Sequence, residues 1–197
     1  MQSTLTSSQG LTQNTVQSFS RSGLGRAVAI VSATAFIAVC AHISVPLPFT
    51  PVPLTMQDLA VLLVGLALGP VDGFAALALY LGEGAAGAPV FSPGLGGTGQ
   101  LFGPTGGYLF AYPLVAAIAG WGARSIRLGN QFARAAVGCL LASAVLFGFG
   151  ATWLQQYTHA SAAMVMRMAV YPFLPGNIVK VAAASGIFSA VSRWRRA

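Results

Sequence analysis

An asparagine and a lysine stand three residues apart in an apolar segment near the C-terminus, Tyr171-Pro-Phe-Leu-Pro-Gly-Asn-Ile-Val-Lys180. Pro172 and Pro175 end any helix that arrives from upstream, and Pro175 is compatible with the first turn of a new one. Asn177 and Lys180 are then expected on one face of the opening turns of that helix. An amide donates and accepts hydrogen bonds, an ammonium group only donates, and an ionisable group in an apolar helix is costly. The pair therefore predicts half of a ligand-binding site.

Few other side chains in the apolar segments could complete such a site. Gln57 and Asp58 begin one segment, and Glu83 lies within another. Asp58 is predicted near the end of its helix, where water can hydrate it. For Glu83 the sequence leaves two interpretations open: contact with the ligand, or an internal ion pair with Lys180 that would have to offset the cost of burying both charges. Apolar walls could come from the aromatic residues Phe49, Tyr80, Phe91, Phe102, Tyr108, Tyr171 and Phe173.

The residue patterns of enzymes and metal centres are missing from the sequence. His42 and His159 are isolated, and Cys40 and Cys139 lie in separate apolar segments without a CxxC spacing. There is no GxSxG or HExxH motif, and the glycine-rich stretch at 89–107 lacks the lysine of a phosphate-binding loop. We therefore expect no catalytic activity, no metal and no cofactor.

The composition is that of an integral membrane protein. Of the 197 residues, 55% are hydrophobic and 7% are charged, and the mean hydropathy is +0.73, whereas soluble domains carry about 25% charged residues. The 24 glycines favour helices that approach each other closely. The net charge of +7 comes from arginines that flank apolar segments, so it indicates membrane orientation and not nucleic-acid binding.

Six apolar segments are candidates for membrane helices. They cover 24–45, 56–68, 73–88, 108–123, 135–154 and 175–191. The second and third are short for a full crossing and are expected to form a helical hairpin. A proline-rich loop at 46–55 should be stiff and extended, with Thr55 capping the next helix, and 155–170 should be a short interfacial helix. Residues 1–20 are expected to be a disordered tail that precedes a single domain at 21–197.

The arginines orient this expected bundle. Six crossings place both termini on one side, together with Arg21, Arg26, Arg124, Arg127, Arg134, Arg193, Arg195 and Arg196. The opposite side holds only Arg167. By the positive-inside rule both termini are cytoplasmic, and the loops at 46–55 and 89–107 are extracytoplasmic. The expected fold is an all-α membrane protein, a bundle of six transmembrane helices with long extracytoplasmic loops and its candidate site on the outer side.

Four segments resemble the signature segments of the BioY family. They are Pro48-Phe-Thr-Pro-Val-Pro-Leu-Thr-Met-Gln-Asp-Leu-Ala-Val-Leu-Leu63, Gly87-Ala-Pro-Val-Phe91, Phe102-Gly-Pro-Thr-Gly-Gly-Tyr108 and Pro172-Phe-Leu-Pro-Gly-Asn-Ile-Val-Lys180. The resemblance spans about residues 25 to 190, with the segments in the family's order. Members of this family are the biotin-binding substrate components (S components) of energy-coupling-factor (ECF) transporters.

The resemblance implies capture of biotin at the outer face of a bacterial cytoplasmic membrane. Transport would then require a transmembrane coupling protein and two cytoplasmic ATPase subunits, which alone use ATP, and a homo-oligomer is also open. The resemblance places Ala29 and Ala33 at the face toward the coupling protein, and Asn177 and Lys180 at ligand contacts of the last helix. The full set of expected substrate contacts is Asn177, Lys180, Glu83, Tyr80, Phe91, Tyr108 and Gln57.

The chain departs from the family pattern at two positions. Asn177 stands where the family often has aspartate, and Glu83 stands where the residue is often apolar. Glu83 could then supply the negative partner that Lys180 loses. A function of a different class also stays open, an ion-gradient-driven biotin carrier in which Glu83 and Lys180 relay a proton. The Ala29 to Ala33 spacing likewise has an alternative, close packing inside the bundle.

Overall fold

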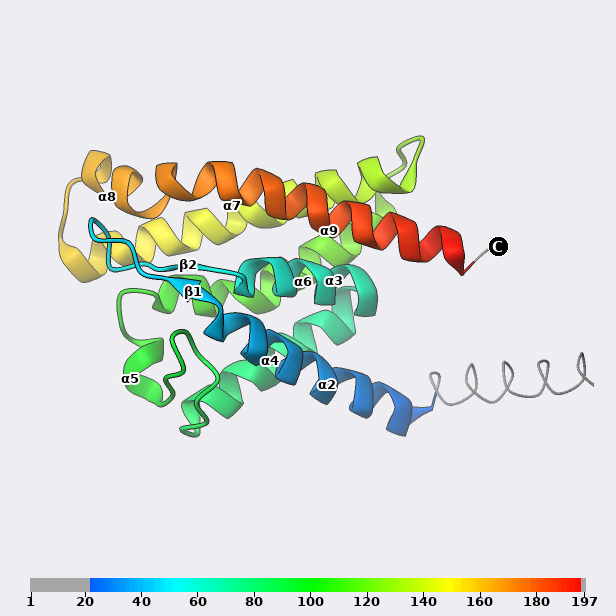
Figure 1. The fold of residues 1–197 in the computed structure, drawn as a ribbon, viewed down its shortest axis with the longest axis horizontal. Coiled ribbons are helices and arrows are strands. Elements are labelled where there is room, and N and C mark those ends of the chain that lie inside the picture. Colours follow the sequence, from blue (N-terminus) through cyan, green and yellow to red (C-terminus); the bar gives the residue numbers. More distant parts are fainter. Residues whose placement is uncertain (1–21, 196–197) are drawn as a thin grey trace, which may run out of the picture.

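The chain folds as a bundle of apolar helices. A computed structural model describes residues 22–195, so the tail predicted at 1–20 lies outside the described residues. The helices are, in chain order, α2 (Gly23–His42), α3 (Gln57–Leu68), α4 (Pro70–Ala85), α5 (Thr98–Leu101), α6 (Gly106–Ser125), α7 (Gln131–Thr158), α8 (Ala162–Ala169), the 3-10 turn η1 (Tyr171–Phe173) and α9 (Leu174–Trp194). Helices α7 and α9 pack together at one edge of the molecule, and α2 lies at the other (Figure 1).

The helices end at two faces of the bundle that differ in chemistry. One face, which we call the basic end, carries Arg26, Arg124 and Arg193 near the ends of α2, α6 and α9. The opposite face, the loop end, carries the loop between α2 and α3, the short helix α5 and α8 (Figure 1). Arg167 lies on α8 at the loop end. The arginines are therefore separated along the helix axes as the sequence predicts.

Helices occur at each of the predicted apolar segments, but they differ in length. Within residues 22–195, three helical stretches are long and apolar enough to cross a membrane, Gly23–His42, Gln131–Thr158 and Ala162–Trp194. Helices α3 and α4 have 12 and 16 residues and form the expected short hairpin. It turns at Gly69, whose φ of +93° suits glycine.

The turn between α3 and α4 is tighter than the sequence predicts. Pro70 occupies the first position of α4, where its missing N–H and fixed φ fit a helix start. Asp72 therefore lies in the first turn of α4 and not in the loop. Its carboxylate pairs with Arg26 of α2 at 2.5 Å, which ties these two helices together at the basic end.

Glycines allow helices at the centre of the bundle to touch. A Cβ atom added at Gly65 of α3 would lie 2.3 Å from the carbonyl oxygen of Ala116 on α6, and one at Gly120 would lie 2.5 Å from the carbonyl oxygen of Gly65. On the other side of α6, a Cβ at Gly122 would lie 2.4 Å from Cα of Gly138 on α7. Larger side chains do not fit where backbones approach this closely. The predicted use of glycine for close helix packing is confirmed.

Helix α2 turns a small-residue face toward the core. Ala33 is 8% exposed and belongs to the buried face of α2, together with Thr34, Ile37 and Ala41, while Ala29 is half-buried. Ala33 therefore packs against the core in this structure, as in the alternative of close packing inside the bundle, and the contact of Ala29 and Ala33 with a coupling protein stays a prediction. The surface of α2 is formed by larger side chains, including Leu24, Val28, Val31, Phe36 and Val39.

The loop end is more ordered than its proline and glycine content suggests. In the proline-rich loop, β1 (Ser44–Val45) pairs antiparallel with β2 (Leu54–Thr55). Thr55 Oγ1 accepts a hydrogen bond from the backbone N–H of Gln57 at 3.3 Å, although the N-cap residue of α3 is Met56. Helix α7 continues to Thr158 and so covers the start of the segment at 155–170, which the sequence predicts to be a short interfacial helix. Within that segment the separate short helix is α8, Ala162–Ala169.

Candidate functional site

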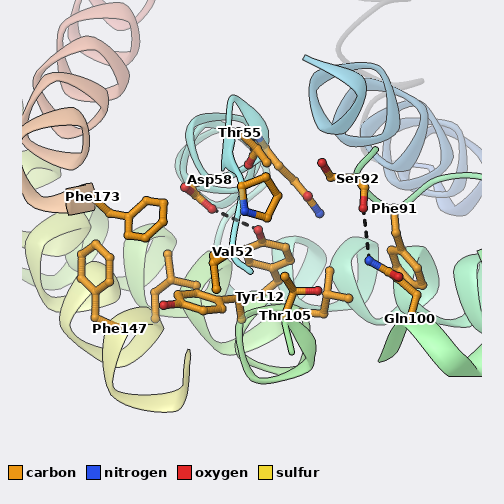
Figure 2. A pocket seen from close by; sticks show the side chains of 15 residues that line it. Val52, Thr55, Asp58, Phe91, Ser92, Gln100, Thr105, Tyr112, Phe147 and Phe173 are labelled. Atoms are coloured by element: carbon orange, nitrogen blue, oxygen red, sulfur yellow. Dashed lines mark hydrogen bonds between the residues drawn. The ribbon is translucent and has the colours of Figure 1, made fainter. Parts of the chain in front are cut away.

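A pocket opens at the loop end between the β1–β2 loop, α3, α6 and α7, with side chains from separate parts of the chain converging on it (Figure 2). Its apolar lining includes Val52, Phe91, Leu109, Leu146, Phe147 and Phe173. Its polar lining includes Gln57, Asp58, Ser92, Gln100, Thr105 and Tyr112. The volume is about 50 Å³, which is small beside the roughly 300–1,000 Å³ of pockets that hold drug-sized ligands. A ligand of that size can enter only if part of the wall moves outward.

The carboxylate of Asp58 is held on both of its oxygens. Lys180 Nζ donates to Oδ2 at 2.7 Å, and Tyr112 OH donates to Oδ1 at 3.0 Å (Figure 2 draws the second bond). The side chain of Asp58 is 23% exposed and that of Lys180 is 10% exposed. The pair joins α3 to α9 and neutralises both charges inside an apolar bundle. Because each carboxylate oxygen can accept more than one hydrogen bond, Asp58 keeps acceptor capacity toward the pocket.

Gln57 and Ser92 bring two more hydrogen-bonding groups to the pocket. Tyr80 OH donates to the Val90 carbonyl at 2.6 Å and accepts from Gln57 Nε2 at 2.9 Å. Since the phenol proton is used on Val90, the nitrogen of the Gln57 amide faces Tyr80 and Oε1 remains as an acceptor. Ser92 Oγ is buried without a hydrogen-bond partner among the described residues, although Ser92 lines the pocket. A buried hydroxyl of this kind is a group that a ligand can satisfy.

The aromatic walls of the pocket are supported from behind. Phe91 is fully buried and meets Tyr80 edge to face, with ring centroids 5.5 Å apart. Helix α4 has Gly84 where Phe91 packs, and an added Cβ there would lie 2.0 Å from the ring. Tyr108 lines the pocket and donates from its OH to the carbonyl of Ala169 on α8 at 2.6 Å. These contacts fix the walls to helices and not only to loops.

The structure brings several of the predicted substrate contacts to one place. Gln57, Phe91 and Tyr108 line the pocket. Tyr80 is fully buried behind Gln57 and Phe91, so it positions them without lining the pocket itself. Lys180 is joined to the pocket through Asp58.

Asn177 lies one turn before Lys180 on α9. It is buried, and its Oδ1 accepts from Ser143 Oγ of α7 at 3.1 Å. It does not belong to the pocket lining. The asparagine therefore links α9 to α7 beside the site, and its part in ligand binding stays a prediction.

Glu83 is not brought to the pocket, and the ion pair considered between Glu83 and Lys180 does not form. Glu83 Oε1 lies 3.1 Å from Thr34 Oγ1 of α2, on the side of α4 that faces away from α9. Lys180 has Asp58 as its partner instead. The reason is the order in which the helices pack. Helix α9, which carries Lys180, packs on α3 and α7, whereas α4, which carries Glu83, packs on α2, α3 and α6.

Other aromatic residues considered for the walls face outward. Phe49, Phe102 and Tyr171 are each more than half exposed. Phe102 stacks with Phe110 and Trp153 in a cluster outside the pocket. Near the loop end such a cluster suits the membrane interface, where aromatic side chains concentrate.

Sequence reasoning missed the central group of the site. Asp58 is predicted as a hydrated helix-end residue, yet it binds Lys180 and Tyr112. One available signal was the position of Asp58 and Lys180 in the opening turns of two helices that start on the same side. Ser92 and Gln100, which is bonded to the Ser92 carbonyl at 3.2 Å, lie in the glycine-rich loop, where no periodic pattern distinguishes inward from outward residues. In residues 22–195 no group of three or more His, Cys, Asp or Glu side chains is placed to hold a metal.

Comparison with known proteins places this architecture in a family. A family model described as the BioY family matches residues 11–197. The chain is 39% identical over 150 residues to the probable biotin transporter BioY of Pyrococcus horikoshii, covering 76% of this chain and 85% of that protein. It is 35% identical over 152 residues to the biotin transporter BioY of Thermotoga maritima, covering 77% and 86%.

A solved structure shares the fold. It is the S-component for biotin from an ECF-type ABC transporter, which matches with a TM-score of 0.79 and 24% identity over 86% of this chain and 92% of that chain. The family match extends over nearly the whole sequence, and the helices are apolar enough for a lipid environment. This chain is an integral membrane protein and belongs to the BioY family.

Proposed function

We propose that this chain captures biotin at the outer face of the cytoplasmic membrane, as the substrate-binding component of an ECF-type transporter. The relatives are named biotin transporters, and the protein of shared fold is an S-component for biotin. The observation that carries the proposal is the pocket at the loop end, where hydrogen-bonding groups lie beside aromatic walls. Biotin likewise has a polar part and an apolar part, because its polar ureido ring is joined to an apolar thioether ring and valeryl chain.

The polar lining suits the ureido ring. Its two N–H groups need acceptors, which Asp58 and the Oε1 atom of Gln57 can supply, and its carbonyl needs a donor, which the Ser92 hydroxyl can supply. The thioether ring and the chain would pack on the aromatic walls that include Phe91 and Phe147. This assignment satisfies the buried Ser92 hydroxyl and leaves the ion pair of Asp58 intact.

The carboxylate of biotin is expected to point toward the opening of the pocket. Lys180 is already neutralised by Asp58, and no arginine, lysine or histidine lines the pocket within the described residues. Equilibrium binding to the full-length protein in detergent tests this, with biotin and biotin methyl ester as ligands. We expect binding of biotin in the micromolar range or tighter, and affinity of the ester within roughly tenfold of it, since no charge-assisted hydrogen bond is lost.

The two possible failures of this measurement are distinct. Absence of biotin binding would overturn the proposed function. Binding of biotin together with rejection of the ester would keep the function and assign the carboxylate to Lys180 instead.

The six-crossing topology and the partners belong to the same proposal. Arginines at the basic end support a cytoplasmic location of both termini, with the pocket outside. A chain without a nucleotide-binding loop needs partners for uphill transport, namely a coupling protein and two ATPase subunits. The alternative carrier, with a proton relay between Glu83 and Lys180, is not favoured because these residues bond to different partners, Thr34 and Asp58.

We propose the β1–β2 loop as the lid of the pocket. Val52 and Pro53 line the pocket from this loop, and Thr50 Oγ1 donates to the carbonyl of Met168 on α8 at 2.8 Å. The β1–β2 loop and the glycine-rich loop are both pocket walls that are not membrane helices. Because the glycine-rich loop is anchored by the fully buried Phe91, the β1–β2 loop can move outward at the lower cost in packing. The bond from Thr50 is then a latch across the mouth of the pocket.

Thr50→Val is expected to speed biotin dissociation roughly fivefold, because the bond to Met168 that it removes contributes about 0.5–1.5 kcal/mol. The bond that Thr50 Oγ1 accepts from the Val52 backbone N–H is also lost, but it lies within the loop and does not join the loop to α8. Association should speed up as well, so that the dissociation constant changes less than either rate. Stopped-flow binding with an unlabelled chase measures both rates. Thr152→Val is the matched control, since the Thr152 hydroxyl bonds within α7 to the Gly148 carbonyl at an exposed position. Equal dissociation rates in wild type and Thr50→Val would exclude the loop as the lid.

A further inference from the structure

A second hollow lies on the side of the bundle, toward the basic end. It is a groove between α2, α3 and α9 with a volume of about 310 Å³. Figure 1 shows α2 and α9 diverging toward their basic ends, with α3 between them. The groove walls are apolar and include Phe36, Leu63, Ala67, Leu68, Ile187 and Val191. Such a groove on the flank of a membrane protein is open to acyl chains and closed to polar solutes.

The end of this groove nearest the C-terminus is polar and positively charged. Arg195 and Ser192 complete its lining. Within the part of the chain that the structure describes, the Arg195 guanidinium has no hydrogen-bond or ion-pair partner. Ser192 Oγ accepts from Gln131 Nε2 at 2.7 Å, so its own proton is left for another acceptor. Two hydrogen-bond donors, the Arg195 guanidinium and the Ser192 hydroxyl, therefore lie at one end of the apolar groove.

We propose that this groove binds an anionic phospholipid of the inner leaflet. One acyl chain would lie along the apolar walls, and the phosphate would accept hydrogen bonds from Arg195 and Ser192. The planar guanidinium matches phosphate oxygens, and an uncompensated arginine favours a lipid whose charge is not offset by a choline group. The groove lies at the opposite end of the bundle from the biotin pocket, so the inference does not depend on the ligand of that pocket.

Native mass spectrometry of the full-length protein tests the proposal. The protein is purified in detergent, stripped of lipid and titrated with phosphatidylglycerol or with phosphatidylcholine of identical acyl chains. We expect one phosphatidylglycerol to be retained in preference to phosphatidylcholine. Arg195→Gln should weaken the binding of phosphatidylglycerol to the protein roughly tenfold, as expected for loss of a charge-assisted hydrogen bond. Arg193→Gln removes the same charge two residues away, outside the groove lining, and should have little effect.

A groove-filling variant locates the bound lipid. Ala67→Trp should displace both lipids while leaving biotin affinity unchanged, and Ala67→Leu serves if the larger side chain prevents folding. Equal retention of the two lipids would overturn the proposal, as would equal effects of Arg195→Gln and Arg193→Gln. So would unchanged retention in the groove-filling variant. A dimer that is lost in Ala67→Trp, without retained lipid, would assign the groove to a second copy of this chain.

Discussion

Lys180→Met is expected to weaken biotin binding roughly ten- to hundredfold and to lower the unfolding temperature. The substitution leaves Asp58 buried without its cation, and removing one partner of a buried ion pair costs about 3–5 kcal/mol. That cost lowers the stability of the protein, whereas the affinity falls because biotin loses a hydrogen bond to a charged acceptor, which contributes about 1.5–3 kcal/mol, or roughly ten- to hundredfold at about 1.4 kcal/mol for each factor of ten. Without Lys180, Asp58 would no longer be held in one position and would no longer present an ordered acceptor to the pocket. Isothermal titration with biotin, together with thermal unfolding in detergent, separates loss of the site from loss of the fold.

A double-mutant comparison shows whether the two charges act as a pair. Asp58→Asn with Lys180→Met removes both charges and should unfold at a higher temperature than Lys180→Met alone, because no isolated charge stays buried. The exposed pair of Arg26 and Asp72 is the control, with side-chain exposures of 55% and 25%. Arg26→Met should change the unfolding temperature little and leave biotin affinity unchanged, because an ion pair of an exposed arginine contributes little to stability. Wild-type affinity in Lys180→Met would show that the ion pair is not part of the site.

The identity of the partner of Lys180 illustrates what could not be predicted from the sequence. Asp58 and Glu83 both lie near the loop end of their helices, so either acid is a candidate partner for Lys180 in the opening turns of α9. The choice between them depends on which helix packs beside α9, and helix neighbourhood is a property of the whole bundle. Helix α3 lies against α9 and α4 does not, so the acid in the opening turn of α3 takes the lysine. The hydropathy pattern of a sequence indicates how deep a residue lies in the membrane, but it does not indicate which helices are neighbours in the bundle.

Helix positions were predictable because local chemistry decides them. Prolines and glycines interrupt the apolar segments, and α3, α6 and α9 begin within two residues of the expected positions. Loops were less predictable, since long-range contacts order them. The glycine-rich loop places Ser92 in the pocket through the packing of Phe91 on α4, and the proline-rich loop is tied to α8 by Thr50. Neither contact has a signature in the local sequence.

The contact between Gly84 and Phe91 is the basis of the second large effect. Gly84→Ala is expected to weaken biotin binding roughly ten- to hundredfold, because overpacking a tight site costs about 1–3 kcal/mol. The added Cβ would lie 2.0 Å from Phe91 Cζ, inside the ring's van der Waals surface. Phe91 is fully buried against Tyr80, so the ring cannot shift inward and must move toward the pocket that it lines. Titration with biotin measures the loss.

Gly82→Ala separates this steric effect from the change in helix propensity. Both glycines lie in α4, and alanine favours a helix over glycine by about 0.8–1.0 kcal/mol at either position. A Cβ at Gly82 meets nothing within 4 Å, so Gly82→Ala should keep wild-type affinity and unfold at an equal or higher temperature. Adding Phe91→Leu to Gly84→Ala should recover part of the stability, since the smaller side chain leaves room for the methyl group. If Gly84→Ala binds biotin as Gly82→Ala does, Phe91 is not a wall of the binding site, and the glycine-rich loop positions the ligand by other residues.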